Sequence, residues 1–457
     1  MVKAIPLNYP MDTQALLEVL RPLGDAVMLD SSQPKTEMRF GRFDILSAAP
    51  EILVRTDIQG VSIRRDGLWS SVATDPFDYL ESLINQLDAQ CEQTELPFKG
   101  GLIGFWSYDL GRSLETLPEH ASTDIDLPWM QLGLYLWAFV IDHQNRSAWL
   151  VHQPKVSNRV MQRLAKIANN LGHEANTELF DFTLEHQWQA NQSKQAYRQA
   201  LEKIDHYIRA GDCYQINYAQ RFKSQYTGDP YGAYQRLKSV APTPFAAFIE
   251  TDHGTLLSLS PERFLQVSAT GAVETRPIKG TRPRGSTLED DQQQIEELRE
   301  ASKDRAENLM IVDLLRNDLS RACKPGSVKV PELFAIETYP NVHHLVSAVT
   351  GQLAQGQSAL SLLKQCFPGG SITGAPKIRA MEIIDELEPD RRSIYCGAIG
   401  YISADGRMDT NISIRTLLCQ KGTIYCWAGG GIVADSDIDD EYQETLNKVN
   451  NLLSALS

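Results

Sequence analysis

Strand-like and helix-like segments are grouped along this chain, and they do not alternate one by one. The first 155 residues predict short strands and turns, because AVMLDSS, FDILSAA and GLYLWAFVIDHQNRSAWLVHQ are rich in β-branched and aromatic residues. From about residue 193, helical periodicity appears near residues 193–211, 288–320, 376–388 and 438–456. Strand segments such as GAIGYIS and DTNISIRTLLCQ lie between these helices. A doubly wound parallel sheet needs regular alternation, so the grouping predicts an α+β fold.

The length of the chain predicts more than one small core. With 457 residues, it exceeds the size at which a single hydrophobic core usually stops growing. The polar stretch GHEANTELFDF, followed by HQWQANQSK, is typical of a connector between two halves. We therefore predict an N-terminal domain over residues 1–185 and a second domain over residues 190–457.

Charge and composition exclude several classes of partner. The formal net charge of −14 argues against nucleic acid, because its binders need a basic surface. We expect no membrane segment, since no run approaches the roughly 20 apolar residues that span a bilayer, and no signal peptide at MVKAIPLNYP. The seven cysteines form no CxxC pair and predict reduced thiols in a cytoplasmic protein. A small anionic substrate is compatible with this charge, because a local cluster of cations can override the average field.

One lysine stands in an unusual setting. Residues 275–285, TRPIKGTRPRG, place Lys279 between proline and glycine residues in a stretch unsuited to a helix. Four cationic side chains fall within these eleven residues. The residues alone leave three interpretations of Lys279 open: a solvated loop lysine, an anion ligand or a nucleophile.

Two predicted helices carry carboxylates on one face. They are Glu300, Asp304 and Glu307 in residues 288–320, and Glu441 and Glu444, with Lys448, in residues 438–456. A solvated surface is the simpler interpretation of either set. Two carboxylates from separate helices nevertheless suit Mg²⁺, which takes one or two protein carboxylates and leaves its other positions to water and substrate.

Glycine-rich segments and two isolated charges complete the candidate site. The glycines of WAGGGIVADS either form a tight bend or bring backbone N–H groups close to an anion. FPGGSITGAPK leads through Pro376 into a helix and suits a carboxylate. Arg415 lies on a predicted core strand and needs a carboxylate partner if buried. Glu262 is either an ion-pair partner of Arg263 or a general acid. Together these features predict a Mg²⁺-assisted site for a small polycarboxylate.

Eight motifs occur in the order found in a known family. They are SPERF, PIKGTRPR, DRAENLMIVDLLRNDL, FPGGSITGAPK, GAIGY, IRT, GGGIVADS and EYQETLNK. In this order they resemble the chorismate-utilising enzymes, and within them the aminodeoxychorismate synthase component I branch. The resemblance covers most of residues 190–455 and extends more loosely to the first half. It implies antiparallel sheets forming a sandwich with helices packed outside, and a chorismate-binding catalytic domain over residues 190–457.

The resemblance also implies roles for single residues. The Mg²⁺ ligands would be Glu307 and Glu444, with Asp304 and Glu441 one helical turn away. The general acid would be Glu262. The substrate would meet Thr281, Thr373, Tyr395, Arg415, Lys448 and the backbone of Gly429, Gly430 and Gly431.

Two positions separate the branches of the family. Members that add water to chorismate carry a lysine base where this chain has Gln215, so isochorismate or salicylate formation is not expected. Anthranilate synthases read PIAGT where this chain reads PIKGT. The resemblance therefore identifies Lys279 as the nucleophile of an enzyme that aminates chorismate at C4.

This chemistry implies partners. The attack requires a neutral Lys279 amine, a form that burial and the cations Arg276 and Arg282 are expected to favour. No cysteine has the setting of a glutaminase nucleophile, so we expect ammonia from a separate glutamine amidotransferase subunit. The product, 4-amino-4-deoxychorismate, would lead through a lyase to 4-aminobenzoate and folate.

Alternatives to this function are an anthranilate synthase large subunit and a non-catalytic protein that senses tryptophan or chorismate. The N-terminal domain, residues 1–185, resembles a domain that binds tryptophan in anthranilate synthases. Ser31 matches one position of that tryptophan pocket. The simpler alternative is that this domain only supports the catalytic half.

Overall fold

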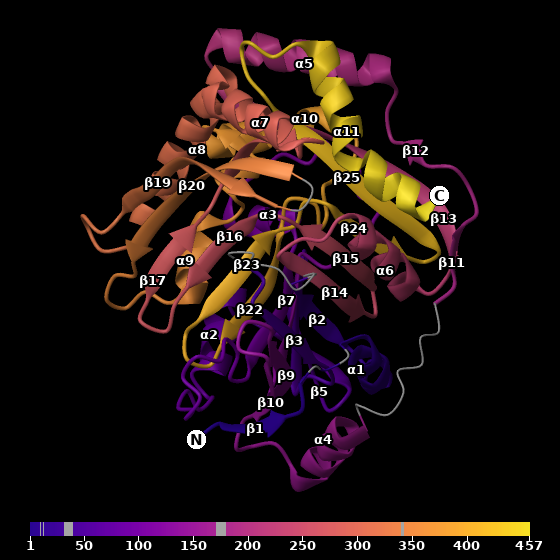
Figure 1. Ribbon diagram of the computed structural model, residues 1–457, viewed down its shortest axis with the longest axis vertical. Coiled ribbons are helices and arrows are strands. Elements are labelled where there is room, and N and C mark those ends of the chain that lie inside the picture. Colours follow the sequence, from indigo (N-terminus) through magenta and orange to yellow (C-terminus); the bar gives the residue numbers. More distant parts are fainter. Residues whose placement is uncertain (10, 12, 32–39, 171–179, 340–341) are drawn as a thin grey trace.

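Two large antiparallel sheets form the body of the molecule (Figure 1). The computed structural model describes residues 1–9, 11, 13–31, 40–170, 180–339 and 342–457. Within these residues the sheets contain 13 and 12 strands. All pairings between their named strands are antiparallel. With helices packed around the sheets, the predicted α+β class is confirmed.

The first sheet combines strands from both halves of the chain. In spatial order it contains β1 (Lys3–Leu7), β10 (Ser147–His152), β9 (Trp137–Asp142), β3 (Phe43–Ser47), β2 (Val27–Asp30), β14 (Phe245–Thr251), β15 (Gly254–Ser260), β24 (Thr416–Gln420), β25 (Thr423–Ile432), β13 (Gln215–Gly228) and β11 (Phe182–Leu184). The short strands β12 (Gln189–Ala190) and β21 (Gly374–Ala375) also pair with β13.

The second sheet is also shared between the halves. Its order is β18 (Ile278–Pro283), β20 (Val342–Gln352), β17 (Ala272–Thr275), β16 (Arg263–Val267), β23 (Met408–Ile412), β22 (Ala398–Ser403), β7 (Gly101–Trp106), β8 (Met130–Tyr135), β4 (Ile52–Asp57), β5 (Gly60–Arg65) and β6 (Leu68–Val72). One more strand, β19 (Lys329–Thr338), pairs with β20.

Helices lie outside the sheets. They are α1 (Thr13–Leu20), α2 (Pro76–Ile84), α3 (Gly111–Leu114), α4 (Asn158–Asn170), α5 (Lys194–Ala210), α6 (Pro230–Val240), α7 (Leu288–Glu300), α8 (Ser302–Ser320), α9 (Ala359–Cys366), α10 (Lys377–Leu387) and α11 (Ile438–Leu456). Five of them, α5, α7, α8, α10 and α11, gather over one end of the sheets, at the top of Figure 1. The chain between residues 1 and 170 lies mainly at the opposite end. None of the described helices is long and apolar enough to cross a membrane.

The sheets pass without interruption across the predicted domain boundary. In the first sheet β2 pairs with β14, and in the second β7 pairs with β22. A shared apolar core joins residues of both halves, such as Ile45 and Phe264. The division near residues 185–190 falls between β11 and β12, and it stays a prediction.

Local sequence signals predict the ends of some helices and strands correctly and miss others. Helix α5 ends at the predicted residue, because Gly211 adopts a left-handed φ of 85°. The single helix expected over 288–320 is wrong: Ala301 has an extended backbone that separates α7 from α8. The strand expected over DTNISIRTLLCQ is also wrong, since β23 belongs to the second sheet and β24 to the first. Both errors have one cause. Hydrophobic periodicity does not reveal a break of one to three residues when the pattern continues on both sides of the break.

Candidate active site

Lys279 lies in a β-bulge of strand β18. Ile278 pairs with Val346 and Thr281 with His344, so β18 contains one more residue than β20 over this interval. Gly280 supports the bulge with a φ of 82°, and a Cβ atom there would lie 2.9 Å from the carboxyl carbon of Asp304. Bulges are common beside active sites because they redirect one side chain out of the ladder. Here the redirected side chain is that of Lys279.

The three glycines of β25 provide the surface that Lys279 faces. They pair with β13 inside a regular strand, so the bend considered from the sequence is wrong. A Cβ atom at Gly431 would lie 3.5 Å from Lys279 Nζ and 2.8 Å from Gln215 Nε2. Any side chain at Gly431 would therefore occupy the space beside the Lys279 amine, which only a glycine leaves open.

Three charged groups of α11 converge over the neighbouring Gly430. A Cβ atom at Gly430 would lie 3.2 Å from Glu441 Oε2, 3.7 Å from Glu444 Oε1 and 3.8 Å from Lys448 Nζ. Lys448 Nζ also donates to the carbonyl oxygen of Gly429 at 2.9 Å. The glycine strand thus brings the predicted carboxylates, the predicted lysine nucleophile and Lys448 to one place.

Glu262 is a buried acid at the start of β16. Its side chain is 6% exposed and accepts a hydrogen bond from Ser371 Oγ at 3.0 Å and another from the Ile278 backbone N–H. Burial raises the pKa of Glu262 to about 7, although the charge of Lys279 acts in the opposite direction. A carboxyl group with this pKa holds a proton near neutral pH and can donate it. The alternative ion pair with Arg263 is not formed, since Arg263 pairs with Asp409 and Glu274.

The carboxylates of α8 and α11 differ in their environment. Glu307 has no ion-pair partner within the described ranges, and burial raises its pKa. In Glu444, burial is opposed and outweighed by Lys448, which lies 2.6 Å away, so the pKa is lowered. Glu441 pairs with Lys303 at 3.0 Å, and Asp304 pairs with Arg282 at 3.3 Å. No group of three or more metal-binding side chains is preformed in the part of the chain that the structure describes.

Arg415 lies at the point where the chain passes from one sheet to the other. It follows β23 and precedes β24 with a positive φ of 48°, so its predicted place on a strand is wrong. Burial lowers its pKa, and no carboxylate among the described residues pairs with it. A desolvated guanidinium without a partner favours an anionic ligand, which it binds in a bidentate fork.

His344 is hydrogen-bonded to Thr281 and is influenced by the charge of Arg415. Burial and the charge of Arg415 lower the pKa of His344 to about 3, so the imidazole is neutral. Its Nδ1 atom lies 2.8 Å from Thr281 Oγ1. Thr281 is exposed and near Lys279 in sequence, and its contact with the substrate stays a prediction.

Thr373 and Tyr395, two of the predicted substrate contacts, are buried. The hydroxyl of Thr373 donates to the carbonyl oxygen of Gly369 at 3.1 Å, so it closes a turn of its own loop. Tyr395 is 3% exposed and stacks on Trp427 of β25, with ring centroids 6.2 Å apart. Contact of either residue with substrate stays a prediction.

The cations expected to favour a neutral Lys279 are compensated by acids. Arg276 pairs with Glu332 and Glu337, and Arg282 pairs with Asp304. Lys279 instead interacts electrostatically with the carboxyl groups of Glu262, Glu307 and Glu444. The immediate surroundings of the Lys279 amine are therefore acidic, in contrast to the prediction.

Comparison with known proteins identifies the family. Residues 62–454 match the family described as chorismate binding enzyme. The chain belongs to the chorismate binding enzymes. The resemblance inferred from eight motifs is confirmed.

Two relatives and one solved structure define the position of this chorismate binding enzyme. It is 48% identical to aminodeoxychorismate synthase component 1 of Klebsiella aerogenes, over 92% of this chain and 91% of that protein. It is 46% identical to the protein of the same name from Escherichia coli K12, over 91% and 90%. Anthranilate synthase component I of Streptococcus pneumoniae superposes with a TM-score of 0.77 at 32% identity, covering 92% of this chain and 94% of that one. The predicted fold of the chorismate-utilising enzymes is therefore confirmed.

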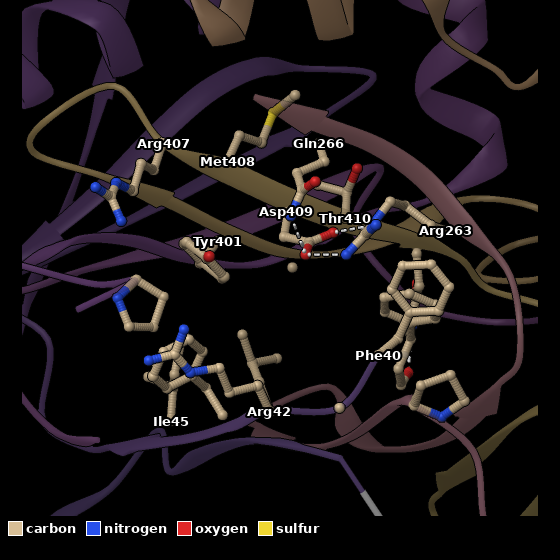
Figure 2. Close-up of a pocket in the computed structure, with 18 of the residues that line it drawn as sticks. Phe40, Arg42, Ile45, Arg263, Gln266, Tyr401, Arg407, Met408, Asp409 and Thr410 are labelled. Atoms are coloured by element: carbon tan, nitrogen blue, oxygen red, sulfur yellow. Dashed lines mark hydrogen bonds and ion pairs between the residues drawn. The ribbon is translucent and has the colours of Figure 1, made fainter. Parts of the chain in front are cut away.

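A separate cavity of about 580 Å³ lies between the two sheets of this chorismate binding enzyme (Figure 2). Residues of β2, β3 and β14 line one side and residues of β16, β22 and β23 the other. Its wall mixes aromatic and charged side chains, including Phe40, Arg42, Arg263, Tyr401 and Asp409. Lys279 and the glycine strand do not contribute to it.

Ser31, the predicted tryptophan-pocket residue, lies beside this cavity. Its neighbour Asp30 lines the cavity, but the Ser31 hydroxyl donates to Asp44 Oδ1 at 2.8 Å. Ser31 is therefore a supporting residue in this structure, and its contact with a ligand stays a prediction.

The sequence did not reveal three residues that shape the active site. Ser371 holds the carboxyl group of Glu262, His344 is hydrogen-bonded to Thr281, and Lys303 pairs with Glu441. Ser371 lies in the glycine-rich loop FPGGSITGAPK, which the sequence did single out. Its partner lies 109 residues earlier, and no local pattern predicts such a pairing.

Proposed function

We propose that this chain is component 1 of an aminodeoxychorismate synthase, which replaces the C4 hydroxyl of chorismate by an amine. The two relatives named above carry that name and match over about nine tenths of the chain. One observation supports the chemistry most strongly: the Lys279 amine faces a bare glycine strand beside Glu262, a buried acid with a pKa of about 7.

In the proposed first step Lys279 is the nucleophile. The neutral amine attacks C2 of the ring, the ring double bonds shift, and the C4 hydroxyl leaves as water with the proton of Glu262. The lysine nitrogen then holds the ring as a secondary ammonium, and Glu262 is a carboxylate. Covalent attachment divides one difficult displacement into two easier ones.

Ammonia attacks C4 in the proposed second step. The bond between C2 and the lysine nitrogen breaks, and Lys279 leaves as a neutral amine. Glu262 accepts a proton from the incoming ammonia, so acid and nucleophile both return to their starting state. Gln215 has no basic group to activate water at this place, which supports ammonia as the second nucleophile.

The carboxylates of chorismate have matching groups on the protein. We propose that Arg415, which has no carboxylate partner among the described residues, binds one of them, and that Lys448 and the N–H groups of the glycine strand bind near the other. A positive φ at Arg415 costs about 1 to 3 kcal/mol at a non-glycine residue, and such strain is typical of functional sites.

Glu307 and Glu444 are the proposed Mg²⁺ ligands. They fit a hard cation, because Glu444 is ionised and Glu307 is a partly buried carboxyl group that forms no ion pair among the described residues. When bound, Mg²⁺ would neutralise a substrate carboxylate and orient the ring. Water and substrate would complete the coordination of a cation held by these two carboxylates.

Removal of Mg²⁺ by a chelator is expected to abolish amination, and Glu444→Gln is expected to raise the half-saturating Mg²⁺ concentration. This concentration should rise about 10-fold or more, because even the residues that hydrogen-bond to metal ligands contribute about 10- to 100-fold to metal affinity. A magnesium titration of initial rates measures this. Glu296→Gln, on the exposed face of α7, is the control. A Glu444→Gln titration that coincides with the wild type would exclude Glu444 as a ligand.

We further propose a cytoplasmic enzyme that receives ammonia from a separate glutamine amidotransferase subunit. Its product leads to 4-aminobenzoate and folate. The mixed aromatic and charged cavity between the sheets is proposed to hold tryptophan. Calorimetric titration with tryptophan tests this, and a heat signal indistinguishable from dilution would reject it.

Product identification is the test of the proposed function. The purified chain, chorismate, Mg²⁺ and ammonium salt are incubated and the product is separated by chromatography. We expect 4-amino-4-deoxychorismate, and a raised KM for chorismate in Arg415→Gln. Anthranilate or isochorismate as the product would place the chain in another branch of the family, and no turnover with intact ligand binding would indicate a sensor.

A further inference from the structure

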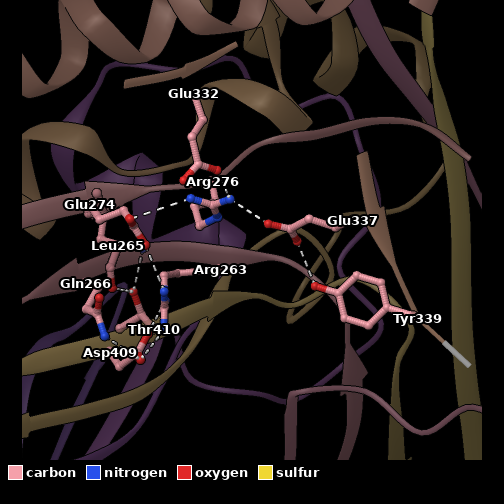
Figure 3. Close-up of polar contacts among 10 residues, drawn as sticks. All are labelled: Arg263, Leu265, Gln266, Glu274, Arg276, Glu332, Glu337, Tyr339, Asp409 and Thr410. Atoms are coloured by element: carbon pink, nitrogen blue, oxygen red, sulfur yellow. Dashed lines mark hydrogen bonds and ion pairs between the residues drawn. The ribbon is translucent and has the colours of Figure 1, made fainter. Parts of the chain in front are cut away.

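Side chains of alternating charge surround Arg276 (Figure 3). Arg276 lies three residues before Lys279, and the carboxylates around it are those of Glu274, Glu332 and Glu337. We call these four residues the Arg276 cluster. Arg263, which pairs with both Glu274 and Asp409, extends this set of charges toward the cavity between the sheets.

Arg276 is held firmly within this cluster. Its side chain is 3% exposed, and Nη2 donates to Glu332 Oε2 at 2.7 Å and to Glu337 Oε1 at 2.5 Å. Nη1 lies 3.6 Å from Glu274 Oε2. Glu337 is oriented by the hydroxyl of Tyr339, which donates to its second oxygen at 2.8 Å. Both carboxylates of β19 therefore point at one guanidinium group.

The cluster joins strands that lie on opposite sides of β20. Thr275, at the end of β17, pairs with Val349, whereas Glu332 on β19 pairs with the adjacent Ala348. The side chain of Arg276 therefore crosses the face of β20 to reach β19. Arg276 thus attaches the connection between β17 and β18 to β19. No ladder hydrogen bonds join that connection to β19 directly.

The backbone between Thr275 and Thr281 needs such an anchor. Pro277 has no N–H to donate, and the bulge at Lys279 and Gly280 interrupts the pairing with β20. Two functional atoms depend on this segment: the Ile278 N–H that donates to Glu262, and the Lys279 amine that faces Gly431. A shift of the segment would move both of them together.

We propose that Arg276 is a positioning residue, which holds the Lys279 bulge against β19 so that the Lys279 amine and the Ile278 N–H stay aligned with Glu262. This inference rests on the proposed function, because it assigns to Arg276 a role that acts through Lys279. Misplacement of a reacting group by about 1 Å can lower a rate about 100-fold. Arg276 touches no substrate, and its effect on the reaction is on geometry alone.

The decisive measurement is steady-state kinetics of Arg276→Gln with saturating Mg²⁺ and ammonium. We expect kcat to fall about 10- to 100-fold, with little change in the KM for chorismate, because the groups that bind the carboxylates are elsewhere. Arg276→Lys should recover part of kcat, since an ammonium reaches one of the two carboxylates. Arg284→Gln removes a guanidinium from the other side of the bulge and should leave kcat unchanged.

A double-mutant comparison separates positioning from general stabilisation. Glu332→Gln combined with Glu337→Gln should lower kcat as Arg276→Gln does, and should cause no further loss in the Arg276→Gln protein. If Arg276→Gln does not fold, the same carboxylate pair carries the test, because both residues are more exposed than Arg276. The proposal would be overturned if the losses of kcat from Arg276→Gln and from the two glutamate substitutions added up fully in the combined variant. An unchanged kcat in a folded Arg276→Gln variant would also overturn it.

Failure of this inference can be distinguished from failure of the proposed function. In the Lys279→Ala protein, Arg276→Gln should lower the residual rate much less than it lowers the wild-type rate, because alignment of the Lys279 amine no longer contributes and only the Ile278 N–H is affected. An equal fall in both proteins would overturn the positioning of Lys279 and leave the nucleophile assignment untouched. If the wild-type chain makes no 4-amino-4-deoxychorismate, the proposed function fails before the variants are compared.

Discussion

Lys279→Ala is expected to lower kcat for C4 amination by about 10³-fold or more, because it removes the nucleophile and with it the covalent route. A factor of 10³ corresponds to about 4 kcal/mol of lost transition-state stabilisation. Since Arg415, Lys448 and the glycine strand stay in place, the KM for chorismate should change far less than kcat. The measurement is the initial rate of product formation at saturating ammonium, with chromatographic identification of the product.

Two further lysine variants make this result specific. Lys279→Arg keeps a positive charge but not a nucleophilic amine, so it should be as inactive as Lys279→Ala. Lys364→Ala removes a half-exposed lysine that pairs with Asp75 far from the glycine strand, and it should keep full activity. An active Lys279→Arg protein would show that the site needs only the charge, and Lys279 would then be an anion ligand.

Glu262→Gln is expected to lower kcat about 10²- to 10⁴-fold, the usual contribution of a general acid. Glutamine is close to glutamate in size, and its carbonyl oxygen can still accept a hydrogen bond from Ser371, but it has no acidic proton for the leaving hydroxyl. The variant should therefore fold and bind chorismate normally while losing turnover. Normal turnover in Glu262→Gln would show that the leaving group obtains its proton elsewhere.

The pH dependence of the wild type reports on the same group. Burial raises the pKa of Glu262 to about 7, so its acid form predominates below pH 7 and is lost above it. With the concentration of free ammonia held constant, and over the range in which Lys279 is already a neutral amine, kcat/KM should fall with rising pH as Glu262 ionises. This decline should be missing from the residual activity of Glu262→Gln. An identical decline in the variant would assign it to another group.

Local signals explain which parts of the fold were predictable. Gly211 ends α5 as expected, because a left-handed residue at a helix end is a local property of the sequence. The change of sheet between β23 and β24 was not predictable, because NISIRTLL has the same alternation on both sides of Arg415. The distinction depends on partner strands that are remote in sequence, and no local pattern contains it.

The site shows the same division. The sequence identified Lys279, Glu262, Glu307 and Glu444 through motifs, and the structure brings their charges together. The sequence predicted the wrong electrostatic surroundings for Lys279. Arg276 lies near Lys279 in sequence, but the carboxylates of Glu332 and Glu337, which pair with Arg276, lie on β19, more than 50 residues later. Charge compensation depends on tertiary contacts, so neighbouring cations in sequence do not determine the field at a side chain.

The covalent adduct provides the most direct test of the account. The purified chain is incubated with chorismate and Mg²⁺ in the absence of ammonia, digested, and analysed by peptide mass spectrometry. We predict a mass increase of one chorismate minus one water on the peptide that contains Lys279, reversed when ammonium is added before digestion. If no adduct forms on Lys279 while the same preparation aminates chorismate in the presence of ammonium, Lys279 is not the nucleophile.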